Sequence, residues 1–277
     1  MLPKTTDEQH CSLCGAEGPF APPCPGGSLR ETRCPVCHSS RRNRDIARVI
    51  VRFCKLDESR PLQEQVGELA RYRIFELQAR GVLHTLLNCL PLYECSEYFP
   101  HLASGEVSSE GILCQNATCL SFEDASFDIV ISQDILEHIE DAPKALMEIN
   151  RVLRPGGTHI FTVPIHDGRK TRQRAFTRID GGIEHSLPAI CHKDPLNSDG
   201  AFVWWDYGDD LAAHITSLGI PTQVALSALF YTPEQVCHVA TQEAYEHYQK
   251  SVANRQIACF FLYNSYVFCA RQSSEAR

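Results

Sequence analysis

Two pairs of cysteines near the start of the chain have the spacing of a metal site. Cys11 and Cys14 form one Cys-x-x-Cys pair, Cys34 and Cys37 form a second, and nineteen residues separate the pairs. Each pair can place two thiolates on one ion, and four thiolates complete a tetrahedral coordination sphere. We therefore predict a structural zinc ion with no coordination position left for catalysis. A redox-active or incidental cysteine cluster is the alternative interpretation.

Histidines are the second group of residues that could take part in catalysis. His166 directly follows a predicted strand, and His185 and His192 lie in the polar stretch after it. An imidazole can act as a general base near neutral pH. Each of these histidines could equally be an ordinary surface or core residue, so we treat them as candidates only.

The segment that carries the cysteines needs the metal in order to fold. Residues 1–40 are rich in glycine and proline and have little apolar periodicity, so they cannot bury a core of their own. From Ser39 to Lys55, apolar residues recur at helical spacing, which predicts a helix. We divide the chain into a zinc-ribbon module (1–40), a linking helix (41–56) and a main domain (57–277).

The main domain alternates predicted strands with predicted helices. Strands are expected over residues 72–77, 92–96, 112–114, 127–132, 158–163, 223–226 and 265–269. Helices are expected around residues 83–87, after the fourth strand, and over 143–153, 208–218 and 233–253. This alternation predicts an α/β fold in which helices cover both faces of a parallel sheet.

Residues 164–204 interrupt the alternation. They are polar and glycine-rich, and they begin where the fifth strand ends. We predict an inserted cap over the active site, because binding residues are often carried by such loops. A surface excursion that contacts nothing is the alternative. If the acceptor is anionic, Arg172 or Arg174 could bind it.

Composition limits the class of protein. The chain has 277 residues, of which 43% are hydrophobic and 22% charged, and its formal net charge is −8. This acidic balance disfavours a nucleic-acid partner, although Arg41, Arg42 and Arg44 form a local basic cluster. We interpret that cluster as a solvated or ion-paired face. No apolar run is long enough to span a membrane and no secretory signal is evident, so we expect a cytoplasmic protein with reduced cysteines.

Three ordered stretches resemble one family. Residues 120–130 (LSFEDASFDIV), 134–139 (DILEHI) and 151–157 (RVLRPGG) are similar to signature segments of the class I, Rossmann-like methyltransferases that use S-adenosylmethionine, in particular the type 11 group. The cysteine pairs followed by Arg41–Arg44 resemble a subgroup with an N-terminal four-cysteine zinc ribbon. The resemblance implies a doubly wound, mostly parallel seven-stranded sheet whose last strand is antiparallel.

The first family motif departs from this pattern. The family usually has a strand-end acid followed by three alternating glycines, whereas residues 76–82 read ELQARGV and contain one glycine. Glu76 matches the acid, and Gly81 can still supply one turn position that other residues avoid. We interpret the stretch as a variant loop that keeps cofactor binding.

The resemblance also implies which residues contact the cofactor. Glu97, after the second strand, matches the acid that accepts hydrogen bonds from the ribose hydroxyls, and Asn116 occupies the position beside the adenine, where a simple turn role is the alternative. Gln133 and Asp134 are expected at the methionine end. The full predicted set is Glu76, Gln78, Ala79, Gly81, Glu97, Tyr98, Asn116, Ala117, Gln133 and Asp134. His138, in the second signature segment, is a further catalytic candidate, although a structural role is favoured there.

The leading functional hypothesis is methyl transfer to oxygen or nitrogen of a small-molecule or glycan-type metabolite, with S-adenosylmethionine and structural Zn²⁺ as cofactors. Three alternatives stay open: an RNA methyltransferase whose ribbon contacts phosphate, a non-catalytic interaction protein, and an enzyme that uses the cofactor without methylating. The sequence predicts neither the acceptor nor the oligomeric state.

Overall fold

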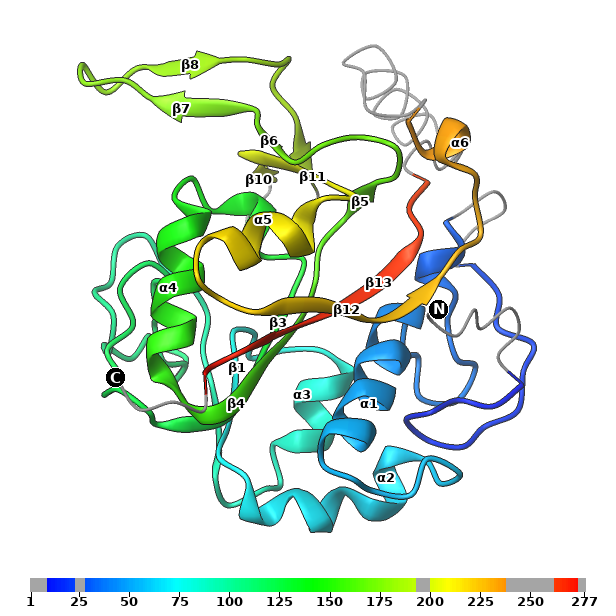
Figure 1. The fold of residues 1–277 in the computed structure, drawn as a ribbon. Helices are drawn as coiled ribbons and strands as arrows, with labels where there is room; N and C mark the ends of the chain where they lie inside the picture. Colours follow the sequence, from blue (N-terminus) through cyan, green and yellow to red (C-terminus); the bar gives the residue numbers. More distant parts are fainter. Residues whose placement is uncertain (1–8, 23–27, 193–199, 238–261, 274–277) are drawn as a thin grey trace.

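A six-stranded sheet organises the computed structural model, which describes residues 9–22, 28–192, 200–237 and 262–273. The strand order is β12-β13-β4-β3-β1-β2 (Figure 1). The strands are β1 (Ile74–Glu76), β2 (Tyr93–Cys95), β3 (Phe127–Gln133), β4 (Leu153–Thr162), β12 (Thr222–Ala228) and β13 (Ser265–Arg271). β1 to β4 pair in parallel, whereas β13 is antiparallel to both of its neighbours. The mostly parallel sheet with an antiparallel last strand is confirmed.

The third expected strand does not form a ladder, so the described sheet has six strands where seven were predicted. Residues 112–114 contribute one parallel bridge, between Glu97 and Cys114. The backbone N–H of Cys114 donates to Glu106, and that of Ser108 donates to Ile112. The chain thus folds back on itself around Gly111, whose φ is +79°, and this local pairing uses the hydrogen bonds that a longer strand would need.

Helices cover both faces of the sheet. The helices are α1 (Arg41–Phe53), α2 (Leu62–Gln65), α3 (Val82–Leu87), α4 (Ala142–Val152), α5 (Leu211–Ser217) and α6 (Pro233–Cys237), with 3₁₀ turns η1 (Leu29–Glu31), η2 (Val66–Arg71) and η3 (Leu136–His138). The expected helix 233–253 is described only over α6, and its remainder lies outside the described residues. None of the described helices is long and apolar enough to cross a bilayer.

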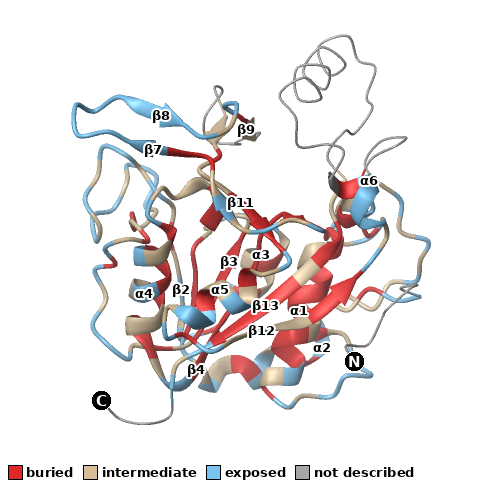
Figure 2. Ribbon diagram, turned by 45° about the horizontal axis from the view of Figure 1, so that its top comes forward, coloured by how far each residue is buried: buried red, intermediate tan, exposed pale blue. Residues whose placement is uncertain are grey.

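Side-chain alternation along β3 explains the two layers. Ile129 and Ile131 belong to a core shared with α1 and α3, whereas Val130 belongs to a second core shared with α4 and α5. Nearly all of β3 is buried (Figure 2). Because both faces are buried, β3 is an almost continuous apolar run, as expected for a central parallel strand. The helix that was predicted to link two modules, α1, therefore also forms part of the layer on one face of the sheet.

The interrupting segment is built from short strands above the carboxyl edge of the sheet. A three-stranded sheet has the order β5-β11-β6, formed by Ile165–His166, Trp205–Gly208 and Arg172–Gln173. β7 (Ala175–Thr177) and β8 (Ile183–His185) form a hairpin that projects away from the body, and β9 (Cys191–His192) pairs with β10 (Ala201–Phe202) (Figure 1). The segment thus has regular structure that its sequence did not indicate.

The basic cluster on α1 is buried and paired. Arg41 is 3% exposed and donates from Nε to Asp45, and Arg42 pairs with Glu31 and Asp134. Arg44 is 0% exposed. Arg41 and Arg42 are ion-paired, in agreement with the expected solvated or ion-paired face, whereas Arg44 is fully buried against neutral oxygens, which the sequence did not indicate. Because these guanidinium groups face protein partners, they form no phosphate-binding surface.

Arg44 attaches the N-terminal segment to α1. Its Nη1 donates to the backbone oxygens of Thr32 (3.0 Å) and Ser39 (2.7 Å), and its Nη2 donates to Thr32 Oγ1 (3.1 Å). The guanidinium lies 4.3 Å from the centroid of the Phe20 ring. The buried guanidinium of Arg44 therefore supplies hydrogen bonds to three acceptors of the N-terminal segment, which has few backbone hydrogen bonds of its own.

We expect Arg44→Met to lower the free energy of unfolding by about 2–4 kcal/mol, because it leaves buried acceptors without donors. Arg52→Met is the control: Arg52 is 37% exposed and pairs with Glu58 at the surface, so its loss should cost under about 1 kcal/mol. Chemical denaturation of both variants measures the difference. Equal effects would contradict this role for Arg44.

Candidate functional site

The four predicted cysteine ligands lie together. Their Sγ atoms are all within 4.8 Å of one another, with Cys11–Cys37 at 3.6 Å and Cys14–Cys34 at 3.7 Å. Zn–S bonds of about 2.3 Å in a tetrahedron place sulfurs roughly 3.8 Å apart. The cysteines are free thiols without disulfides. Their geometry fits a four-thiolate zinc site.

Two equivalent turns present these thiols. In the first turn the N–H of Cys11 donates to Ala16 and the N–H of Gly15 donates to Cys11; in the second, Cys34 donates to Ser39 and His38 donates to Cys34. The fifth residue of each turn has a positive φ, +79° at Gly15 and +60° at His38. The repeated geometry aims both thiol pairs at one point.

The acid at the end of β1 is held by protein partners. Glu76 is 0% exposed; its carboxylate accepts from Tyr93 Oη (2.8 Å) and from Gln133 Nε2 (3.0 Å). Burial raises the pKa of Glu76 to about 8, against the lowering effect of these hydrogen bonds. Gln133 in turn accepts from Asn43 Nδ2 on α1 (2.6 Å). These contacts tie β1, β3 and α1 together at the sheet edge.

The loop after β1 and the end of β2 form an open part of the same edge. The Oε1 atom of Glu97 accepts from the Ala79 N–H at 3.1 Å, so the glycine-poor loop contacts the predicted ribose-binding acid. Gly81 has a φ of +96°, and a Cβ built there would meet nothing within 4 Å. Gln78 is partly exposed and Tyr98 is 55% exposed. The structure thus brings this group of predicted cofactor residues together.

Asn116 has the alternative role that the sequence left open. Its Oδ1 accepts from the backbone N–H and the hydroxyl of Thr118, both at 2.9 Å, so the side chain closes a turn. The neighbouring Ala117 is 7% exposed and belongs to the core beside β3. A hydrogen bond from an adenine at this position would therefore be accepted by a group other than the side-chain oxygen of Asn116.

Asp134 lies at the centre of a charged network and does not extend freely toward a ligand. Its carboxylate accepts from Arg30 (2.5 and 2.8 Å), from Arg42 (2.6 Å) and from Thr162 Oγ1 (2.9 Å). These arginines hold the pKa of Asp134 well below its usual range, although burial acts in the opposite direction. Asp134 also has a φ of +51°, a conformation that is uncommon outside glycine and that often marks functional segments.

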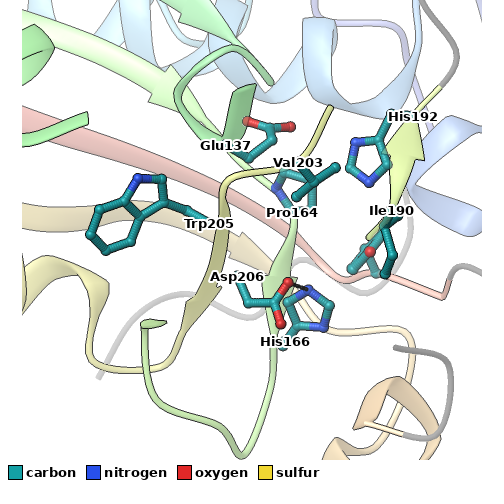
Figure 3. A pocket seen from close by; sticks show the side chains of 9 residues that line it. Glu137, Pro164, His166, Ile190, His192, Val203, Trp205 and Asp206 are labelled. Atoms are coloured by element: carbon teal, nitrogen blue, oxygen red, sulfur yellow. Dashed lines mark ion pairs between the residues drawn. The ribbon is translucent and has the colours of Figure 1, made fainter. Parts of the chain in front are cut away.

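Three of the four candidate histidines surround one region, and the fourth does not. His166 and His192 line a small pocket together with Glu137 and Asp206 (Figure 3). The ring of His138 lies 5.1 Å from that of His192. His185 is exposed on β8 in the projecting hairpin. Burial lowers the pKa of His166 to about 4 and that of His192 to about 3, so both imidazoles are neutral at neutral pH.

Asp206 organises the other side of the pocket. It lies 3.5 Å from His166 Nε2 and accepts two 2.7 Å hydrogen bonds from Arg174, which is 1% exposed. Arg172 also pairs with Asp206. The expectation that Arg174 could bind an anionic acceptor is therefore wrong, because this side chain is buried and bound to a protein carboxylate.

Several pocket residues were not predicted from the sequence. Glu137 is 1% exposed, and burial, reinforced by the nearby Asp134 charge, raises its pKa well above the usual value. Asp206 and Tyr263 come from distant segments of the chain. The signal for Glu137 was its place beside His138 in the DILEHI stretch. Nothing in the sequence separated Asp206 or Tyr263 from ordinary surface residues.

A comparison with known protein families finds a match that covers part of the carboxyl edge of the sheet. Residues 92–161 match the family model described as "Methyltransferase domain". The matched segment runs from β2 almost to the end of β4, so it includes Glu97, Asp134 and the Glu137–His138 pair. Residues 92–161 form part of a methyltransferase domain.

Curated relatives match over short stretches. The chain is 50% identical over 42 residues to a dimethylglycine N-methyltransferase of Parasynechococcus marenigrum, covering 15% of each chain. It is 31% identical over 111 residues to a demethylmenaquinone methyltransferase of Renibacterium salmoninarum, covering 38% of this chain and 45% of that one. The chain thus spans less than half the length of these relatives.

Similar solved structures share less sequence identity with this chain. One is an S-adenosylmethionine-dependent methyltransferase from Mesorhizobium loti, with 14% identity and a TM-score of 0.41, covering 76% of this chain and 95% of that one.

Proposed function

We propose that this protein is a methyltransferase that uses S-adenosylmethionine to methylate oxygen or nitrogen of a small-molecule or glycan-type acceptor. The observation that carries the proposal is the family match over residues 92–161, because that segment supplies polar side chains to the carboxyl edge of the sheet. In wound α/β sheets ligands bind at this edge. Similar relatives named for dimethylglycine and demethylmenaquinone support a small acceptor.

The residues at the ends of β1 and β2 fit the cofactor. Glu97 offers a partly exposed carboxylate for the ribose hydroxyls, and Gly81 leaves room for close approach of a ligand. Gln78, Ala79 and Tyr98 are proposed to contact the cofactor beside these residues, whereas Ala117 packs in the core. When bound, S-adenosylmethionine supplies an electrophilic methyl group. The remaining task of the protein is to orient the acceptor and, for a hydroxyl, to accept its proton.

We assign acceptor binding to the pocket between η3 and the β5-β11-β6 sheet. His166 and His192 line this pocket as neutral imidazoles, because burial disfavours their protonated forms, and Asp206 contacts His166. We propose that the described residues 164–192 and 200–204, together with β11, cover this region and exclude water, which is the role predicted for the inserted cap. We place the protein in the cytoplasm, where its thiols would stay reduced.

We further propose that Cys11, Cys14, Cys34 and Cys37 hold a structural zinc ion. Four thiolates fill its coordination sphere, so the ion would not take part in methyl transfer. Cys11, Cys34 and Leu13 are buried in the same core as α1 and β3. A ribbon built into the core in this way would stabilise the domain and the edge of the sheet together.

The cofactor proposal is tested by calorimetric titration with S-adenosylhomocysteine. We expect Glu97→Ala to weaken binding roughly 10- to 150-fold, because a charge-assisted contact is worth about 1.5–3 kcal/mol. Glu94→Ala is the matched control, since Glu94 is an exposed carboxylate on the same strand and should leave the affinity unchanged. No binding by the wild type, or equal affinities of all three proteins, would contradict the proposal.

The zinc proposal is tested by titrating protein purified without added metal with a mercurial reagent and a zinc indicator. We expect about one thiol-bound zinc per chain, and its loss in Cys14→Ser, because three thiolates hold the ion more weakly. Cys89→Ser removes an exposed cysteine outside the cluster and should retain the metal. Wild-type protein whose four thiols react freely and release no zinc would rule the site out.

A further inference from the structure

A second cluster of metal-ligand atoms lies at the carboxyl edge, far in sequence from the cysteines. Ligand atoms of Glu137, His138 and His192 are all within 4.8 Å of one another. The first two residues belong to η3, and the third belongs to β9 in the inserted segment. Two imidazoles and one carboxylate are a common ligand set of catalytic zinc and of non-haem iron, and they leave coordination positions open.

Glu137 has the surroundings of a ligand that lacks its ion. Its side chain is 1% exposed, and both carboxylate oxygens are buried without a hydrogen-bond partner. His138 Nε2 is 3.8 Å from Oε1, which is too far for a hydrogen bond. A buried carboxylate without partners is costly, and proteins normally pair such a group or use it to bind a metal. One carboxylate oxygen lies within 4.8 Å of a ring nitrogen of each imidazole.

The orientation of His138 supports the same interpretation. Its Nδ1 lies 2.8 Å from the backbone oxygen of Phe202, which can only accept, so Nδ1 carries the proton. The lone pair is therefore on Nε2, the nitrogen on the Glu137 side. Histidines that bind metals typically donate their other ring N–H to a carbonyl or carboxylate in this way, which fixes both the tautomer and the ring.

His192 completes the cluster from the opposite side. Its ring is nearly perpendicular to that of His138, at 87°, with centroids 5.1 Å apart. Ligand atoms of one ion lie roughly 3–3.5 Å apart, so the three side chains would close in by about 1 Å on binding.

The nearby positive charges do not prevent cation binding. Arg30 and Arg42 lie close to Glu137, but both guanidinium groups are bound to Asp134, and Arg42 also pairs with Glu31. Two carboxylates therefore compensate the two arginines. This leaves the charge of Glu137 to compensate an added ion.

We propose that Glu137, His138 and His192 bind a divalent transition-metal ion that is distinct from the four-cysteine site. Glu137 and His192 also line the pocket that contains His166 and Asp206, so the open coordination positions lie beside it (Figure 3). An oxygen anion or hydroxyl of a small molecule is the ligand class suited to those positions. The inference goes beyond the proposed function, because metal binding is measured without cofactor or acceptor.

The test is a titration of the full-length protein with Co²⁺ after weakly bound ions have been removed by dialysis and the thiol site has been filled with Zn²⁺. We expect one Co²⁺ per chain, with visible d–d absorption and no sulfur-to-cobalt charge-transfer band. Glu137→Gln and His192→Ala should each weaken binding at least tenfold. His185→Ala, which removes an exposed histidine of the same inserted segment, should bind as the wild type does.

Thermal unfolding separates loss of the site from loss of the fold. Glu137→Gln replaces a buried carboxyl group without hydrogen-bond partners by an amide of nearly the same size, so its metal-free form should unfold near the wild-type temperature, and added Co²⁺ should raise the midpoint of the wild type only. Wild-type protein that binds no Co²⁺ once the thiol site is filled would overturn the proposal. So would a folded Glu137→Gln variant with wild-type affinity.

Discussion

The carboxylate of Asp134 connects three parts of this molecule that lie far apart in sequence. It accepts hydrogen bonds from Arg30 in the ribbon segment, from Arg42 on α1 and from Thr162 at the end of β4. The Arg30 side chain is 4% exposed, so its charge depends on this partner. Removing one member of a buried ion pair is strongly destabilising, because the other charge is left uncompensated. The N-terminal segment is thereby held on the edge where the sheet presents its functional residues.

The neighbouring contacts follow from that arrangement. Because the start of α1 lies beside the end of β3, Asn43 donates a hydrogen bond to Gln133. Gln133 in turn donates one to Glu76 on β1. η3 begins directly after this point and carries Glu137 and His138 toward β9 and β11. A module that the sequence divides from the main domain is thus part of the wall of the site. The zinc ion proposed for the cysteines would then stabilise the site indirectly, by ordering the segment that holds Arg30.

The sequence predicted what depends on local pattern. The apolar run of β3, the Pro155–Gly157 stop after α4 and the paired cysteines carry their own signals, and the structure has each of these features. Predictions failed where a distant partner decides the role. From the sequence, Arg44 and Arg174 resemble ordinary surface cations. In the structure, Arg44 donates to Thr32 and Ser39, and Arg174 donates to Asp206. From the sequence, residues 112–114 resemble a strand. In the structure, Cys114 donates its backbone hydrogen bond to Glu106 within a local hairpin. Side-chain pairing across 5 to 32 residues leaves no periodicity to detect.

The most direct test of this account is amide hydrogen exchange in Asp134→Asn, with Asp128→Asn as the control. Asp128 is a partly exposed carboxylate on the same strand, where it binds the Arg73 N–H and Arg154. Loss of the Asp134 charge leaves Arg30 and Arg42 sharing Glu31 as their acidic partner. Breaking a buried ion pair costs about 3–5 kcal/mol, and a cost of 1.4 kcal/mol already corresponds to a tenfold change in an opening equilibrium. The account predicts exchange at least tenfold faster in residues 28–40 of Asp134→Asn, with α4 unchanged, and wild-type exchange in residues 28–40 of the control. Wild-type exchange throughout residues 28–40 of Asp134→Asn would contradict it.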